Sequence, residues 1–274
     1  MAMKLAGGCR VSEMNEGPAT VSGTLKIWSQ VSRATGAKAI SLRILEFAQG
    51  QSPALQNAGA DEVLYLLENL DQSQPWSNHC TINIDQEPFE VNSQTGIYIK
   101  PGQNFSIENM TEKPVVFVSC QCPVIDENTI SNELQVAPII RLNDRAALPT
   151  ADRWYRVLVD DEVGSRQVTQ FVGSIPPGRA PDHFHHYEEV LFILKGTGRM
   201  WADQTHTEIG PGSCVYLPKG QVHCVENTGT SELRLLGVFY PAGSPAVSEP
   251  GRAVVGMVYS LTTGLVTLVD GENL

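Results

Sequence analysis

Basic residues are scarce in this chain, and long apolar runs are missing. Lys and Arg number 19 against 30 Asp and Glu, a formal charge of −11, and no basic run occurs. This balance argues against a nucleic-acid partner and against docking on an anionic membrane surface. No stretch approaches the roughly 18 continuous apolar residues of a membrane span, and the N-terminus lacks the apolar stretch of a secretory signal. We therefore expect a soluble cytoplasmic protein that contacts no membrane and has a flexible N-terminus.

Cysteines are few and scattered, at positions 9, 80, 120, 122, 214 and 224. They form no disulfide framework, so reduced thiols are expected. Cys120-Gln-Cys122 has the spacing of a metal-binding pair, but no second close pair accompanies it and the preceding VVFVS is typical of a strand. We interpret these two cysteines as structural.

Sustained helical periodicity is also rare. The 24 Gly and 17 Pro residues separate short apolar, β-branched runs instead. This pattern predicts an all-β protein, because runs of this length and composition, bounded by turn residues, favour strands. The clearest candidates are 40–47, 62–67, 96–99, 115–119, 167–172, 189–194, 214–217 and 233–239.

Two blocks of sequence occur twice in the same order. DEVLYLL at 61–67 aligns without a gap on EEVLFIL at 188–194, and YIKPGQNFSIEN at 98–109 aligns on YLPKGQVHCVEN at 216–227. A repeat of this kind indicates a duplicated domain. We predict an N-terminal domain at 22–125, a C-terminal domain at 145–243 and a tail at 244–274. The first copy has a polar insertion at 71–80.

The second copy carries the most informative motifs. Residues 178–196 read GRAPDHFHHYEEVLFILKG, and residues 212–227 read GSCVYLPKGQVHCVEN. These blocks resemble the two signature motifs of the cupin superfamily. The second fits that pattern at every specified position, whereas the first has four residues rather than five between Gly178 and His183. The resemblance covers both halves and implies a bicupin: two tandem cupin barrels, each a jelly roll.

The resemblance also implies one divalent metal in the C-terminal barrel, held by His183, His185, Glu189 and His223. Alternation along a strand would point His183 and His185 to the same side, and His223 would come from another strand. A mixed set of imidazole and carboxylate ligands suits Fe, Mn, Ni, Co or Zn. With unperturbed imidazoles, metal-dependent activity should fall below about pH 6.

Three classes of function fit such a site. The first is a metalloenzyme acting on a small organic molecule, similar to quercetin-dioxygenase-like cupins, in which Glu189 is both a ligand and the catalytic proton acceptor. The second is a Lewis-acid isomerase or decarboxylase, and the third is a non-catalytic small-molecule binding or sensory protein. A homodimer is expected. The candidates to line the substrate pocket are Arg179, Phe171, Trp201 and Tyr216.

The first copy lacks these ligands. The aligned repeats place Phe105 on His223 and leave Glu62 alone on Glu189, with Gln56 and Ala58 on the two motif histidines. A single carboxylate is a poor transition-metal site. We therefore predict one metal ion per chain, with the N-terminal barrel serving as a scaffold, a dimerisation surface or a metal-free pocket.

Overall fold

The computed structural model describes residues 2–56, 59–69, 78–123, 138–150 and 152–246, together with the backbone of two short strands near the C-terminus. Most of the polar insertion at 71–80, much of the expected linker, most of the tail and Ala58 lie outside these residues. Within the described part, strands dominate, no α-helix occurs, and no helix is long and apolar enough to cross a membrane. The predicted all-β class is confirmed, and each of the eight expected strands is present.

The first barrel consists of two facing sheets. Its seven-stranded sheet has the order β14 (Ile139–Arg141), β11 (Thr95–Ile99), β8 (Ala60–Leu66), β13 (Val115–Pro123), β5 (Leu42–Phe47), β4 (Leu25–Val31) and β3 (Thr20–Ser22). The second sheet has the order β10 (Glu87–Asn92), β9 (His79–Ile84), β12 (Asn104–Asn109) and β6 (Gly50–Gln51), with β7 (Leu55–Gln56) also on β12.

The second barrel repeats this plan. Its eight-stranded sheet has the order β1 (Met3–Lys4), β2 (Arg10–Glu13), β22 (Ser213–Leu217), β19 (Glu188–Lys195), β24 (Leu233–Tyr240), β17 (Thr169–Ile175), β16 (Arg153–Val159) and β15 (Leu148–Thr150). The facing sheet has the order β18 (Gly178–Arg179), β23 (His223–Asn227), β20 (Gly198–Ala202) and β21 (Thr205–Ile209). A separate hairpin joins β25 (Gly256–Tyr259) to β26 (Val266–Val269). Four short 3-10 helices also occur in the described chain, at Ala6–Gly8, Arg33–Thr35, Leu142–Asp144 and Asp161–Val163.

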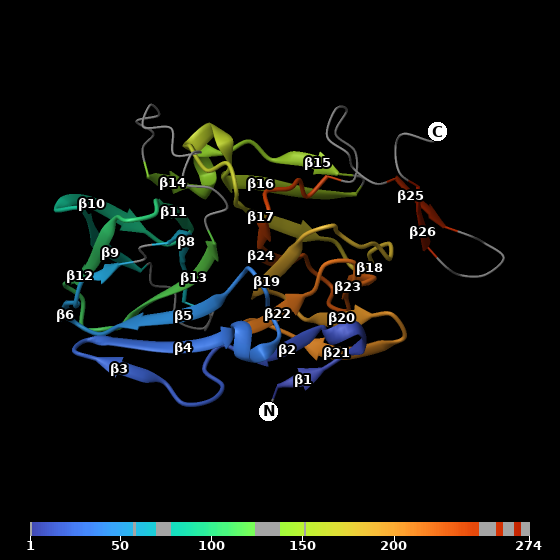
Figure 1. The fold of residues 1–274 in the computed structure, drawn as a ribbon, viewed down its shortest axis with the longest axis horizontal. Helices are drawn as coiled ribbons and strands as arrows, with labels where there is room; N and C mark the ends of the chain where they lie inside the picture. Colours follow the sequence, from blue (N-terminus) through green and yellow to red (C-terminus); the bar gives the residue numbers. More distant parts are fainter. Residues whose placement is uncertain are drawn as a thin grey trace.

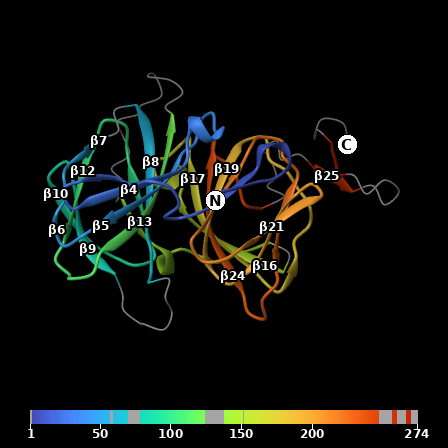
Figure 2. The same cartoon turned by 90° about the horizontal axis from the view of Figure 1, so that it is seen from below.

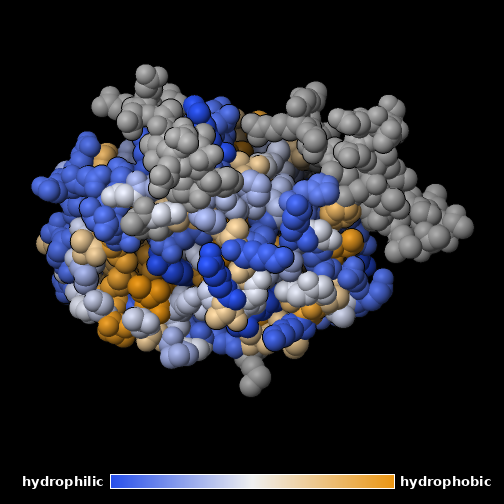
Figure 3. Space-filling model, viewed as in Figure 1, coloured by the Kyte–Doolittle hydropathy of each residue, from blue (hydrophilic) through white to orange (hydrophobic). Residues whose placement is uncertain are grey.

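The barrels lie side by side, with their largest sheets turned toward each other (Figure 2). Strand alternation explains why both faces of these sheets are apolar. On β8, Val63 and Tyr65 belong to the cluster between the barrels, whereas Leu64 and Leu66 belong to the core inside the first barrel. Many hydrophilic residues lie on the coloured part of the face in Figure 3, together with one apolar patch at its lower left.

The chain exchanges short segments between the barrels. β2 pairs with β22 of the second barrel, and β14 pairs with β11 of the first (Figure 1). The expectation of a flexible N-terminus is therefore wrong: the start of the chain adds two strands to the far barrel, and Cys9 is fully buried there. The predicted limits 22–125 and 145–243 remain predictions, but each barrel recruits a segment from outside them.

All six cysteines lie in described segments, and all are buried without a disulfide. Cys120 and Cys122 belong to the cluster between the barrels, and burial raises the pKa of both thiols. A protonated thiol surrounded by apolar side chains is a packing group and a poor metal ligand. The structural interpretation of this pair is consistent with its surroundings.

Candidate metal centre

Backbone pairing brings the two motif segments together. His183 precedes β19 and His223 begins β23, and each donates its amide N–H to the carbonyl oxygen of the other, at 2.9 and 2.8 Å. The carbonyl of His185 accepts from the amide of Gly220 at 2.8 Å. The two motif histidines were expected to share a regular strand; instead His183 forms an isolated bridge, and His185 lies in irregular backbone just before the bend at His186 and Tyr187.

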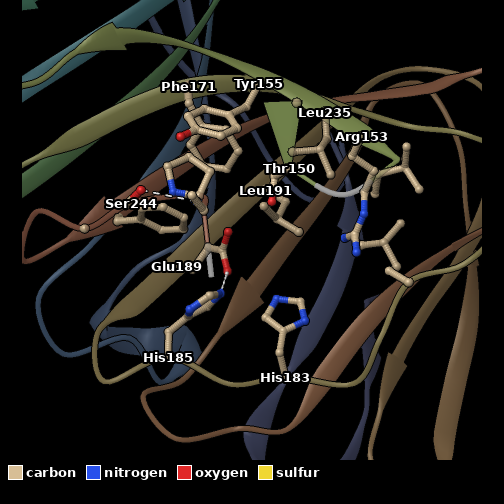
Figure 4. Close-up of a pocket in the computed structure, with 18 of the residues that line it drawn as sticks. Thr150, Arg153, Tyr155, Phe171, His183, His185, Glu189, Leu191, Leu235 and Ser244 are labelled. Carbon is tan, nitrogen blue, oxygen red and sulfur yellow. Dashed lines mark hydrogen bonds and ion pairs between the residues drawn. The ribbon is translucent and has the colours of Figure 1, made fainter. Parts of the chain in front are cut away.

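The three imidazoles meet at one point inside the second barrel. The ring centroid of His183 lies 4.3 Å from that of His223 and 4.9 Å from that of His185, and one ring nitrogen of each residue lies within 4.8 Å of the others. Glu189, on β19, completes the group: its Oε2 lies 3.3 Å from His185 Nε2 and 3.6 Å from His223 Nε2 (Figure 4). The structure thus brings together all four residues that the motifs predicted as ligands.

Two of the rings are held in the orientation that metal binding requires. The Nδ1 atoms of His183 and His223 lie 3.0 and 2.8 Å from the carbonyl oxygens of Pro181 and Gln221. A carbonyl oxygen can only accept, so each Nδ1 carries the proton and each Nε2 keeps its lone pair. A partner on the outer nitrogen that sets the tautomer is typical of metal-binding histidines.

Burial decides the charges of the group. Removal from water lowers the pKa of His183 and of His223 to about 4 and holds that of His185 well below its usual value, so these rings are neutral at pH 7. Burial also raises the pKa of Glu189 to about 8. The Oε2 atom of Glu189 is buried without a hydrogen-bond partner. A buried carboxylate oxygen beside the imidazole nitrogens of His185 and His223 fits a divalent cation, which would offset its desolvation.

A cavity of about 600 Å³ opens above these residues. Its wall is largely apolar and includes two neighbouring aromatic rings, Phe171 on β17 and Phe239 on β24, whose centroids lie 4.9 Å apart. Gly237 makes room for the first ring, since a Cβ atom there would lie 2.3 Å from Phe171. Leu191, Leu235 and Tyr155 continue the wall (Figure 4).

Only one of the four expected pocket residues lines this cavity. Phe171 does, whereas Arg179, Trp201 and Tyr216 lie elsewhere. Arg179 is on the outer side, where its guanidinium lies 4.3 Å from the centroid of the Trp201 ring and 3.0 Å from a carboxylate oxygen of Asp182. The indole N–H of Trp201 donates a hydrogen bond to a carboxylate oxygen of Glu226 at 2.8 Å, outside the cavity.

Tyr216 lies on the opposite face of its sheet. Its ring belongs to the cluster between the barrels, and its hydroxyl donates to Glu188. Glu188 also accepts from the amides of Lys38 and Ala39, at 2.9 and 2.7 Å, so it links the two barrels. Alternation explains the correction: Tyr216 pairs with Val190, which faces the other barrel, and not with Glu189.

Sequence reasoning missed several residues around the cavity. Arg153 and Tyr155 come from β16, which follows the expected linker, and residues 242–246 follow β24. Tyr187 stacks on His185, with ring centroids 4.7 Å apart and planes 9° apart. Tyr187 lies inside the first motif and could have been suspected from it. The others have no local signal, since only the barrel's closure brings them to the site.

In the first barrel, Glu62 takes the position of Glu189, but different side chains surround it. Glu62 is 1 % exposed, and its Oε1 accepts from Arg43 Nη2 at 2.7 Å and from the Ser119 hydroxyl at 2.6 Å. Its Oε2 accepts from Gln121 Nε2 at 3.0 Å. Among the described residues, the three histidines of the second barrel are the one set of three His, Cys, Asp or Glu side chains close enough to hold a metal.

The polar partners of Glu62 occupy the positions that aromatic residues occupy in the second barrel. Gln121 on β13 pairs with Glu62, as Phe239 on β24 pairs with Glu189. On the next strand, Arg43 of β5 corresponds in the same way to Phe171 of β17. The first barrel thus places a guanidinium and an amide against the carboxylate of Glu62. Phe105, which the aligned repeats place at the position of His223, is buried in the core of the first barrel.

Comparisons with known proteins match both the sequence of the second barrel and the fold of the whole chain. A family model of the cupin domain matches residues 171–239, the stretch that contains all four ligand candidates. A structure described as a glyoxylate-induced protein of Pseudomonas aeruginosa matches 91% of this chain and 95% of its own, with a TM-score of 0.72 and 16% identity. Residues 171–239 form a cupin domain, and the chain has the bicupin fold of two tandem cupin barrels.

A second solved structure matches both barrels of the bicupin. Oxalate decarboxylase of Bacillus subtilis, a protein with Mn(II) centres, has a TM-score of 0.67 over 85% of this chain and 78% of its own, at 14% identity. Identities this low show a shared fold and leave activity open.

Sequence relatives match only part of the bicupin. Auxin-binding protein 1 of Arabidopsis thaliana is 32% identical over 84 residues, which are 27% of this chain and 42% of that protein. Quercetin 2,3-dioxygenase of Bacillus subtilis is 27% identical over 96 residues, 34% of this chain and 28% of that protein. The bicupin therefore spans less than half the length of either relative.

Proposed function

We propose that this bicupin is a metalloenzyme of dioxygenase-like type that acts on a small organic molecule in the C-terminal barrel. One observation carries the proposal: three imidazoles and a buried carboxylate oxygen that accepts no hydrogen bond converge at the floor of a largely apolar cavity. Clustered titratable groups in such a cavity are the usual mark of an active site.

The ligands would be His183, His185, His223 and Glu189. Three nitrogen donors and one oxygen donor suit Fe, Mn, Ni, Co or Zn. When bound, a divalent metal supplies Lewis-acid polarisation of a substrate oxygen or activation of dioxygen. Glu189 is the one carboxylate among the described residues that line the cavity, so we assign to it the uptake of a proton from a hydroxyl or enol group of the substrate.

The cavity wall favours an apolar substrate over a very small dicarboxylate. Phe171, Phe239 and Leu191 offer flat and aliphatic surfaces, and about 600 Å³ is far more space than an oxalate ion fills. The apolar wall would hold an aromatic or aliphatic body by burying it from water, and would exclude water around the reacting atoms. Partial likeness to quercetin 2,3-dioxygenase supports the same class.

A non-catalytic binding protein is the second candidate. The likeness to auxin-binding protein 1 favours it, since the same cavity could retain a small molecule without turnover. The two candidates differ in one measurable respect: a dioxygenase consumes dioxygen when its substrate is added, whereas a binding protein consumes none.

The test is oxygen uptake with protein purified anaerobically and loaded separately with Fe, Mn, Ni, Co or Zn. Catechols, flavonols, β-diketones and hydroxy acids form the substrate panel. We expect uptake with at least one redox-active metal and an apolar substrate, and none with the Zn form or with Glu189→Gln. Saturable binding without uptake across the panel would favour the binding protein, and turnover in the absence of oxygen would favour an isomerase or decarboxylase.

Metal affinity should depend on pH through Glu189. In the metal-free protein its pKa is about 8, so at pH 7 the carboxyl is protonated and must lose that proton to bind a cation. The apparent affinity should rise about tenfold per pH unit up to about pH 8 and then level off. The histidines, with two pKa values of about 4, add their own protons only in more acidic solution, below the window near pH 6 that unperturbed imidazoles predict.

Chelator competition at pH 6, 7, 8 and 9 measures this dependence. Glu189→Gln is the control, because its amide has no proton to lose; it should bind more weakly and with little change over the same range. A wild-type affinity that does not vary between pH 6 and 8 would contradict the assignment of Glu189 as a ligand.

A further inference from the structure

The described part of the cavity wall contains a single cationic side chain. Arg153, at the start of β16, is the single Lys or Arg among the described residues of the cavity wall. In Figure 4 its guanidinium extends into the cavity on the side of His183, with Thr150 nearby. Its side chain is 22% exposed, so it is mostly removed from water.

Few protein contacts offset the partial removal of the Arg153 guanidinium from water. Its one ion pair among the described residues joins Nε to Asp152 Oδ1 at 3.5 Å, and the Asp152 side chain is 73% exposed. A loose pair with a solvated carboxylate contributes little. The Nη atoms of Arg153 donate no hydrogen bond to the described protein, although guanidiniums in apolar surroundings normally have such partners.

Other arginines of the same barrel are engaged. Arg179 contacts Asp182 and the Trp201 ring, and Arg234 contacts Glu232 at 2.7 Å. Arg156, three residues further along β16, donates to the Leu142 carbonyl at 3.0 Å. A cation that faces a cavity with its terminal nitrogens free has the geometry for a bidentate pair with a carboxylate.

We propose that Arg153 binds a carboxylate group of the substrate, so that the site takes organic acids with an apolar body. This inference refines the proposed function. The acid group pairs with Arg153 on the His183 side of the cavity, and the body packs against the wall that contains Phe171, Phe239 and Leu235. A neutral analogue of the same shape would leave the guanidinium unpaired in the cavity.

The test compares two probes of nearly equal shape, 3-phenylpropanoate and 3-phenylpropanamide, by calorimetric titration of the full-length protein loaded with Zn. A hydrogen-bonded charge pair of this kind corresponds to a roughly 10- to 100-fold preference for the carboxylate in the wild type. Arg153→Gln should remove that preference, and Arg153→Lys should keep part of it. Arg166→Gln removes the same charge from an exposed residue outside the cavity wall and should keep it fully.

Repeating the titrations with metal-free protein separates this inference from the metal assignment. Arg153 predicts a carboxylate preference in both forms, so the result stands even if the metal ligands prove different. Equal affinity for the two probes in the wild type would overturn the inference. So would a preference that survives in Arg153→Gln, or failure of the wild type to bind either probe.

Discussion

Replacing His223 by Ala is expected to abolish stoichiometric metal binding while leaving the barrels folded. His223 is 3% exposed, its Nε2 lies 3.6 Å from Glu189 Oε2, and its Nδ1 is held by the Gln221 carbonyl. Loss of an outer-sphere partner alone typically costs 10- to 100-fold in metal affinity, so loss of a ligand should cost at least about 100-fold. The apolar core cluster of the second barrel does not include His223, so we expect the barrel to stay folded.

Elemental analysis and circular dichroism together decide this prediction. His206→Ala is the matched control: His206 is an exposed histidine of the same barrel whose ring lies against Trp201, away from the three clustered imidazoles. It should keep the wild-type metal content. Full metal content in His223→Ala would remove His223 from the ligand set, and global unfolding would mean that the barrel depends on this side chain.

Arg43→Met is expected to destabilise the protein by about 3–5 kcal/mol, because it removes one partner of a buried ion pair. Glu62 is 1% exposed, and the Arg43 side chain is 18% exposed. Without the guanidinium, the carboxylate keeps its hydrogen bonds from Ser119 and Gln121 but has no neutralising charge. The uncompensated carboxylate makes the substitution far costlier than the loss of a surface pair.

Denaturant unfolding with the double variant tests the cause. Adding Glu62→Gln to Arg43→Met removes the orphaned charge, so most of the lost stability should return. An Arg43→Met variant that loses less than about 1 kcal/mol, or a double variant no more stable than the single one, would show that Glu62 is not held by this pair.

Local patterns predicted the fold and the proximity of the four candidate ligand side chains. The spacing of His183, His185 and Glu189 belongs to a short segment, and the second block places His223 through the turn at Gly220. Backbone pairing between residues 183 and 223 then makes these two blocks one site. The local backbone differed from the prediction, since His185 lies in an irregular segment rather than on a strand.

Residues whose role depends on which face of a sheet they occupy were predicted less well. Tyr216 lies in a motif strand, but both faces of that strand are buried, one in the barrel and one between the barrels. An apolar pattern on both faces gives no signal for orientation. Arg153 and the N-terminal strands reach the second barrel by long-range pairing, which composition and periodicity do not encode.

The central claim is a single metal centre, in the second barrel. Anomalous diffraction at the absorption edge of the metal found in the purified protein tests it most directly. The prediction is one peak per chain, at bonding distance from His183, His185, His223 and Glu189. Strong density beside Glu62, or stoichiometric metal in the crystal with no peak among the three imidazoles, would contradict the account.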